Sequence, residues 1–222
     1  MAMRIQYEDD WLIAVDKPPG MVVHPTYKNK TGTLLDWLLP HLDGRASVSP
    51  RIITRLDKDT SGLVLVALTP QAHARVQKDA HAGRVRKEYL AIVRGVPDPP
   101  SGSIVLPLAR SPEDRRRVIV TPEGQPSETR YEVIRTDGVR ALVRCELVTG
   151  RTHQIRVHLA SRGWPVVGDP TYGEADSAIP RQALHSWRVA LLHPVSRARL
   201  DIEAPIPSDM AEVEPNRWST RQ

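Results

Sequence analysis

The sequence predicts a single α+β domain with a mixed, largely antiparallel β-sheet and flanking helices. Candidate strands outnumber candidate helices along the 222 residues, and the two do not alternate strictly as they would in a parallel α/β fold. Asp137-Gly138, between two alternating segments, is a strong hairpin signal. The chain has no repeat and no clear linker. Residues 1–207 are therefore expected to form one domain, and residues 208–222 are expected to form a polar tail that frays.

Strands are predicted where short apolar or alternating segments are bounded by turn-forming residues. Lys17-Pro18-Pro19-Gly20 marks the turn of a first hairpin, and Leu63–Leu68 is so uniformly apolar that it indicates a buried strand. Residues 101–126 combine prolines, glycines and a basic cluster, so short strands joined by a mobile loop are expected there. The other predicted strands are, in chain order, 11–16, 21–24, 52–53, 86–95, 127–136, 140–147, 184–191 and 199–202.

Three helices are predicted from their ends. In each, a threonine precedes the first helical residue and can accept hydrogen bonds from the first turn. Pro70 suits the first turn of the second helix, while Gly83 and Gly163 would end the second and the third. The predicted helices with their caps are Thr33 before 34–39, Thr69 before 70–82, and Thr152 before 153–161.

Composition narrows the functional class. The chain is 40% hydrophobic and 26% charged, which is typical of a globular protein. Its net charge of +5 and its pI near 9.6 favour a polyanionic partner. The single cysteine, Cys145, excludes an internal disulfide and a thiolate metal cluster, and we expect it to be buried in a strand. No signal peptide or membrane-length apolar run is present, so cytoplasmic residence without membrane association is expected.

The stretch from Arg55 to Gly62 is the most informative part of the chain. It is a charged, turn-forming patch between two apolar extended segments, with the carboxylate of Asp57 two residues from Arg55 and one from Lys58. Cations this close keep a carboxylate ionised, and a loop between buried strands can present it rigidly to a substrate. The same pattern alone also describes an ordinary solvated turn, because most charged runs are surface features.

A second polar stretch begins the predicted third helix. His153 and Arg156 are three residues apart and share one helix face. The helix start offers backbone N–H groups, the Arg151 side chain and the positive end of the helix dipole. Together these suit a phosphate, or a carboxylate such as Asp57. An ordinary basic helix start accounts for the pattern equally well.

Two weaker signals concern acid–base chemistry and metal binding. Tyr89 lies in a predicted strand near Arg84, Arg86 and Lys87, whose charges would ease ionisation of the phenol and make it a candidate general base. An isolated strand tyrosine is more often structural. Asp57-Lys58-Asp59 also matches a D-x-D metal site of nucleotide-sugar transferases, but three residues match often by chance. No histidine–carboxylate spacing completes a metal site, so no metal is expected.

Together these stretches resemble the RluA family of RNA pseudouridine synthases. Residues 55–63, Arg-Leu-Asp-Lys-Asp-Thr-Ser-Gly-Leu, are similar to the family's signature around its catalytic aspartate, and 150–158, Gly-Arg-Thr-His-Gln-Ile-Arg-Val-His, to its second signature. The resemblance implies a pseudouridine synthase domain with a central RNA-binding cleft. Supporting matches in the family's order are 7–10, Lys17-Pro18, 87–89, 129–131, Gly168-Asp169 and Ala204-Pro205.

The chain departs from the family pattern at two positions. Thr54 stands where the family usually has histidine, and Asp16 where asparagine is common. Neither position supplies the reacting group, so activity is expected to survive. The matching residues begin almost at once, so we expect no preceding S4 RNA-binding domain, as in the short members of the family. A monomer is expected.

The resemblance implies an isomerisation. The N–C1′ glycosidic bond of a uridine breaks, the uracil turns, and its carbon 5 bonds to C1′. No atom is lost and no redox change occurs, so no cofactor is expected. Asp57 would act on the ribose, either as a nucleophile at C1′ or as a base at C2′, and the sequence leaves both routes open.

The resemblance also assigns roles to the other residues. Arg156 would pair with the Asp57 carboxylate, and Tyr89 would stack on the uracil and remove the proton from carbon 5. Arg55 would occupy the space that the flipped nucleotide leaves in the RNA. A basic loop would grip phosphates. The residues expected to bind RNA are Arg55, Arg110, Arg115, Arg116, Arg117, Arg151, His153 and Gln154.

Three functional hypotheses follow. The first is an RNA pseudouridine synthase acting on stem-loops of 23S rRNA, tRNA or both. The second is a non-catalytic RNA-binding or RNA-folding protein, although a pure binder would not need Asp57, Tyr89 and Arg156 together. The third is a metal-dependent glycosyltransferase that uses Asp57 and Asp59. The sequence does not identify the target uridine.

Overall fold

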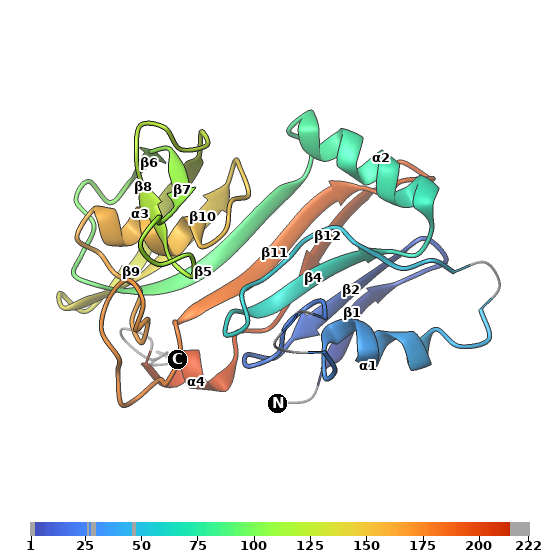
Figure 1. The fold of residues 1–222 in the computed structure, drawn as a ribbon, viewed down its shortest axis with the longest axis horizontal. Helices are drawn as coiled ribbons and strands as arrows, with labels where there is room; N and C mark the ends of the chain where they lie inside the picture. The colour runs from blue at the N-terminus through green and yellow to red at the C-terminus, as the bar shows by residue number, and fades with distance from the viewer. Residues whose placement is uncertain (1–2, 26, 28–29, 46–47, 214–222) are drawn as a thin grey trace, which may run out of the picture. The chain divides into compact units, whose positions relative to one another are not determined.

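A computed structural model describes residues 3–25, 27, 30–45 and 48–213. The chain divides into two compact units, shown as a ribbon in Figure 1. The first comprises Met1–Arg86 and Ser186–Pro205, and the second comprises Lys87–His185 and Ile206–Gln222. Within the described part, every helix lacks the length or the apolar character that a membrane span requires.

The first unit is built on an antiparallel sheet. Strands follow one another in the order β1-β2-β4-β11, with β3 beside β4 and β12 beside β11. Two helices, α1 and α2, accompany them. The elements are β1 (Arg4–Glu8), β2 (Leu12–Lys17), α1 (Leu34–His41), β3 (Arg51–Ile52), β4 (Ser61–Ala67), α2 (Pro70–His81), β11 (Leu184–Leu192) and β12 (Arg199–Glu203).

Strand β4 is buried over its whole length, as its uniformly apolar sequence predicts. Alternate residues of a strand face opposite sides of its sheet. Leu63, Leu65 and Ala67 belong to a core cluster that includes Val76 of α2. Val64 and Val66 belong to a second cluster that includes Leu38 of α1. Because both faces of β4 are covered, the strand shows no polar alternation.

The second unit holds four antiparallel strands and a small two-stranded ribbon. The sheet order is β5-β10-β9-β6, and the ribbon pairs β7 with β8. The predicted Asp137-Gly138 hairpin is confirmed as the connection from β9 to β10. The elements are β5 (Arg86–Arg94), β6 (Ser101–Val105), β7 (Leu108–Arg110), β8 (Val118–Val120), β9 (Glu128–Thr136), β10 (Arg140–Leu147), α3 (Gln154–Ser161) and α4 (Ser208–Val213).

The caps of the first two predicted helices are confirmed. The Thr33 side chain accepts from the backbone N–H of Asp36, and the Asp36 carboxylate accepts from the backbone N–H of Thr33, which forms a capping box. Thr69 accepts from the N–H of Ala72 at 3.2 Å. Cys145 is fully buried in β10, as predicted, and burial raises the pKa of its thiol to about 12.

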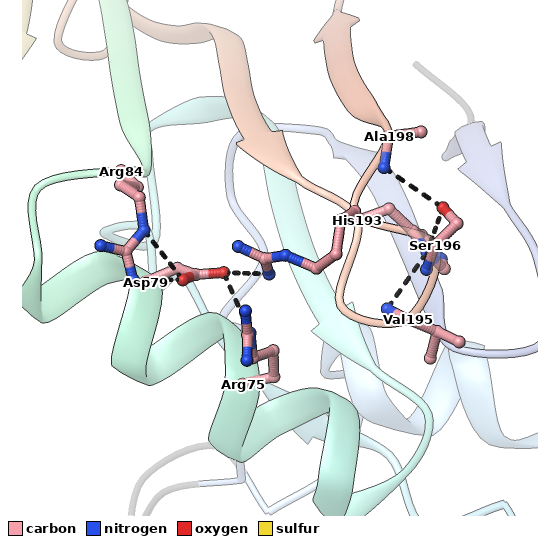
Figure 2. Close-up of polar contacts among 8 residues, drawn as sticks. Arg75, Asp79, Arg84, His193, Val195, Ser196 and Ala198 are labelled. Atoms are coloured by element: carbon pink, nitrogen blue, oxygen red, sulfur yellow. Dashed lines mark hydrogen bonds and ion pairs between the residues drawn. The ribbon is translucent and has the colours of Figure 1, made fainter.

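Helix α2 is tied to the β11–β12 turn through one buried carboxylate (Figure 2). Asp79 is 1% exposed and accepts from Arg84 at 2.6 Å and from Arg197 at 2.5 Å. Arg75, one turn earlier on α2, lies 3.6 Å away. A buried carboxylate needs such partners to stay ionised, and the hydrogen bond from Arg197 is the main cause that lowers the pKa of Asp79 to about 2.

Three local predictions are wrong. Residues 21–24 form no strand; β2 pairs with β1 and β4, and the carbonyls of Val22 and Val23 accept from the first N–H groups of α1. Thr152 does not cap α3, because the N-cap is His153 in a left-handed conformation. The expected frayed tail begins with α4, whose Met210 and Val213 are buried. Residues 214–222 lie outside the described part.

Candidate active site

The Asp57 loop runs from β3 to β4 in the first unit. Thr54 is buried, and its Oγ1 accepts the N–H of Leu65 in β4 at 2.8 Å, which holds the start of the loop against the sheet. The backbone N–H of Thr60 donates to the carbonyl of Asp57 at 3.2 Å and closes a tight turn around the carboxylate. Asp57 is half-buried, so it sits in a defined place and retains access to solvent.

Lys17 holds this loop in place through hydrogen bonds. Its side chain is 0% exposed, and its ammonium donates to the carbonyls of Pro18 at 2.8 Å, Met21 at 2.9 Å and Lys58 at 3.0 Å. Three acceptors match the three donors of an ammonium, which is what a buried lysine requires. Lys17 therefore joins the turn after β2 to the residue beside Asp57.

Gly62, the second residue of β4, occupies a position where no other residue fits. Its φ is +106°, and a Cβ built on it would lie 2.2 Å from the carbonyl oxygen of Ser186 in β11. The Ser186 hydroxyl in turn donates to the carbonyl of Leu63 at 3.2 Å. The glycine of the predicted signature thus lets β4 and β11 approach closely directly after the Asp57 turn.

Arg55 is exposed on the same loop. Partial burial lowers the pKa of His24, and the charge of Arg55 lowers it further, so the two side chains are electrostatic neighbours. An exposed arginine on a loop whose backbone is fixed is compatible with the predicted insertion into RNA, and that role stays a prediction.

Tyr89 lies in β5 of the second unit and is 6% exposed. It is opposite Cys145 in the antiparallel ladder, which fixes its backbone. Arg84 is one of the cations expected to ease ionisation of the Tyr89 phenol, and it forms an ion pair with Asp79. Burial lowers the pKa of the neighbouring Lys87. The role of Tyr89 against a uracil stays a prediction.

Arg156 projects from α3 and is 5% exposed. Its Nε donates to Oδ2 of Asp169 at 2.7 Å and its Nη2 to Oδ1 at 2.8 Å, so a planar, two-pronged pair fixes the guanidinium. Burial alone would raise the pKa of Asp169, but the hydrogen bonds and the charge of Arg156 lower it. The predicted pairing of Arg156 with Asp57 concerns the other unit and stays a prediction.

Gln154 is hydrogen-bonded within the start of α3. It is 2% exposed; its carbonyl oxygen accepts from the N–H of Arg151 and the hydroxyl of Thr149, both at 2.9 Å. Its amide donates to the carbonyl of Glu128 and the hydroxyl of Thr129. All four interactions hold the start of α3, and the contact of Gln154 with RNA stays a prediction.

The basic residues around the β7–β8 ribbon differ in how available their charges are. Arg110 donates to the carbonyl of Arg115 at 2.7 Å, and Arg116 forms a two-pronged pair with Asp114. Arg117 lies over the ring of Tyr172, with its Cζ 5.6 Å from the ring centre. These contacts order the turn between β7 and β8. Because Arg116 is paired with a carboxylate, its charge is neutralised more than those of Arg110 and Arg117.

A pocket of about 310 Å³ opens beside this ribbon and brings two predicted RNA-binding residues together. Arg110 and Arg151 line it, with Leu108 and Val118 among its apolar residues. A basic, partly apolar hollow of this size suits the backbone or an unstacked base of single-stranded RNA. Its other lining residues are Ala109, Glu123, Gly124, Gln125 and Thr152.

Sequence reasoning missed three residues with evident structural roles at the site. The sequence places Lys17 in a turn, although a lysine that ends an apolar strand is a signal for a buried, hydrogen-bonded ammonium. Asp169 appeared as a family match without a role, and its distance from Arg156 in sequence hid the pair. Tyr172 carried no signal. It accepts the N–H of Val118 at 2.7 Å and lies 2.8 Å from Nδ1 of His153.

Comparison with known proteins gives a consistent set of relatives. Residues 11–161 match the family model described as RNA pseudouridylate synthase. A ribosomal large subunit pseudouridine synthase D from Nitrosomonas europaea is 44% identical over 222 residues, which cover 95% of this chain and 64% of that protein. An uncharacterised RNA pseudouridine synthase from Bacillus subtilis is 39% identical, with 97% of this chain and 73% of that protein covered.

The chain thus spans just under two thirds of the length of the Nitrosomonas relative. Among solved structures, human RNA pseudouridylate synthase domain containing 4 is similar with a TM-score of 0.76 and 23% identity. That similarity covers 94% of this chain and 90% of the human one and supports the fold alone.

Proposed function

Because the chain belongs to the RNA pseudouridylate synthase family, we propose that it isomerises specific uridines in structured RNA to pseudouridine, with Asp57 as the reacting group. The observation that carries the proposal is that the family match at residues 11–161 contains Asp57, Tyr89 and Arg156 together. The enzyme would need RNA and no cofactor. Residues 1–207 would form the catalytic domain, and the protein would act as a cytoplasmic monomer.

The geometry of each unit supports the proposed division of labour. In the first, Asp57 stands on a turn that Lys17 and Gly62 hold in place, which suits a group that must reach C1′ or C2′ of the ribose. In the second, Asp169 fixes the guanidinium of Arg156, which would keep Asp57 charged when the two meet. The central RNA-binding cleft that the resemblance implies is part of this proposal.

The proposed substrate is large-subunit rRNA, because the Nitrosomonas relative is named as a ribosomal large subunit enzyme. Transfer RNA is the second candidate from the sequence. Mapping pseudouridines in rRNA and tRNA from cells with and without the gene would identify the RNA and the position. Loss of a site from tRNA alone would contradict the rRNA assignment.

The test of the chemistry is Asp57→Asn and Asp57→Ala. We expect both variants to release no tritium from RNA labelled at uracil carbon 5, while they still bind that RNA, because the amide or methyl group can neither attack nor deprotonate the ribose. Asp10→Asn, a change of the same chemistry at an exposed bend, is the matched control and should keep wild-type turnover.

Two results would contradict the proposal. Normal turnover in either Asp57 variant would remove Asp57 from the reaction. Tight RNA binding by the wild type with no tritium release from rRNA or tRNA would favour a non-catalytic RNA-binding protein. Full activity in excess chelator would exclude the third hypothesis, a metal-dependent transferase using Asp57 and Asp59.

A further inference from the structure

Tyr172 connects two elements of the second unit that the proposed function uses. It lies in the loop after Asp169 and packs with Leu108 of β7, Val118 of β8 and Val157 of α3. One side chain therefore touches both the ribbon that carries the basic residues and the helix that carries Arg156. Neither the sequence signatures nor the family match, which ends at residue 161, gives this tyrosine a role.

The hydroxyl of Tyr172 makes two hydrogen bonds, one to β8 and one to the residue that starts α3. Its oxygen accepts the backbone N–H of Val118 at 2.7 Å, in β8, and it lies 2.8 Å from Nδ1 of His153. With the oxygen accepting from Val118, the hydroxyl hydrogen can be donated to Nδ1, so a neutral His153 would carry its proton on Nε2. His153 has a φ of +54°, which costs energy for a residue other than glycine and needs outside support.

The ring of Tyr172 faces the key arginine. The Cζ of Arg156 lies 5.1 Å from the ring centre, within the range of a cation–π interaction. Asp169 holds the same guanidinium from its edge through Nε and Nη2, and it also accepts the backbone N–H of Thr171 at 2.9 Å. Edge and face contacts together leave the Arg156 head group little freedom to rotate.

From these contacts we propose that Tyr172 is a positioning residue for pseudouridine formation. Its ring keeps Arg156 in the orientation that the reaction needs, and its hydroxyl ties the β8 end of the basic ribbon to the start of α3. This inference rests on the proposed function. Tyr172 would not touch the uridine, so its loss should slow the reaction more than it weakens RNA binding.

Two substitutions separate the ring from the hydroxyl. Tyr172→Phe keeps the ring and removes both hydroxyl bonds; we expect kcat to fall about tenfold, with the Kd for RNA within about twofold of wild type. Tyr172→Leu also removes the ring that Arg156 and Arg117 both face and should lower kcat about a hundredfold, as expected when a reacting group's partner is misplaced. Tyr27→Phe is the matched control, because Tyr27 is 93% exposed, and it should behave as wild type.

A second measurement reports the geometry without any turnover. The side-chain Nε–Hε signal of Arg156 in ¹H–¹⁵N spectra of the RNA-free protein senses the Tyr172 ring. We expect it to keep its position in Tyr172→Phe and to move in Tyr172→Leu. The ¹⁵N signals of the His153 ring should change in both. Because Tyr172→Phe is the gentler change, we expect it to lower Tm by less than about 5 °C, so it decides if the leucine variant does not fold.

The outcomes distinguish this inference from the proposed function. If the wild type releases no tritium from any RNA, the proposed function fails and the role of Tyr172 in that reaction fails with it, whatever the spectra show. If the wild type is active, unchanged kcat in folded Tyr172→Phe and Tyr172→Leu would overturn the positioning role alone. A raised Kd at unchanged kcat would overturn it as well and make Tyr172 an RNA-binding residue. An Arg156 signal that stays fixed in Tyr172→Leu would contradict the contact itself.

Discussion

At the scale of single residues, the position of Asp57 depends on a lysine that never meets the substrate in the proposed reaction. Lys17 is fully buried, yet its ammonium is satisfied by three backbone carbonyls, one of them next to Asp57. A neutral or shorter side chain would leave buried carbonyls without hydrogen-bond donors. The free energy lost in this way is larger than the net contribution of the hydrogen bond itself. The loop carrying Asp57 would then lose its anchor.

We therefore predict that Lys17→Gln lowers the free energy of unfolding by about 2 to 4 kcal/mol and lowers kcat, because both the fold and the Asp57 turn use the ammonium. Urea unfolding followed by circular dichroism would measure the first effect and tritium release the second. Lys78→Gln, at an exposed position of α2, is the matched control. Equal stability of the two variants would contradict the anchoring role.

At the scale of elements, the same logic governs how α2 is held. The helix packs Ala72 and Val76 into the core, but its far end depends on Asp79. That carboxylate accepts from Arg84, just after the helix (Figure 2). It also accepts from Arg197 in the β11–β12 turn. Asp79 and Arg197 are 118 residues apart in the sequence, so their contact depends on the tertiary structure.

The low pKa of Asp79 predicts an acid-sensitive contribution to stability. The folded value, about 2, lies below the ordinary value of 3.8, so the charged form is favoured by folding. Its contribution is fully present above about pH 4 and is lost as the pH falls towards 2. Asp79→Asn should unfold more easily at pH 7, by about 2 to 4 kcal/mol, because the arginines lose their partner.

The difference between wild type and Asp79→Asn should shrink in urea titrations at pH 3 and below. Asp10→Asn, whose side chain is exposed, serves as the control and should show no such change. A gap between wild type and Asp79→Asn that stays constant from pH 7 to pH 2 would show that the ionised carboxylate is not the stabilising form.

At the scale of the whole molecule, the net charge of +5 is expected to act through RNA phosphates. In the structure, the arginines differ in how available their charges are to a phosphate. Arg110 and Arg151 line one pocket, whereas Arg116 is 84% exposed but already paired with Asp114. A paired arginine gains less from a phosphate, because its existing contact must be weakened first.

Arg110→Gln and Arg151→Gln should each weaken RNA binding and reduce the slope of log Kd against log salt by about 0.7 to 0.9. Arg116→Gln, with the same change of charge on the same ribbon, should have a clearly smaller effect. Filter binding between low and moderate salt would measure all three. Equal slopes for the three variants would mean that the pocket has no special part in binding.

The amino-acid sequence by itself determined most of the elements and the family. Local rules suffice for α2, for the β9–β10 hairpin and for the buried strand β4, because caps, the Asp-Gly turn and apolar runs act within a few residues. They failed at 21–24, which looked extended but caps α1, and at Thr152, where the left-handed His153 starts α3.

Only the tertiary structure decided which side chains support the Asp57 loop, Arg156 and the end of α2. Lys17 with Lys58, Asp79 with Arg197, and Arg156 with Asp169 and Tyr172 are contacts between segments that no periodicity relates. The physical reason is that a buried charge is tolerated only where distant chain segments deliver partners to it. The sequence shows which residues carry a charge, whereas the partner of each buried charge is seen only in the folded structure.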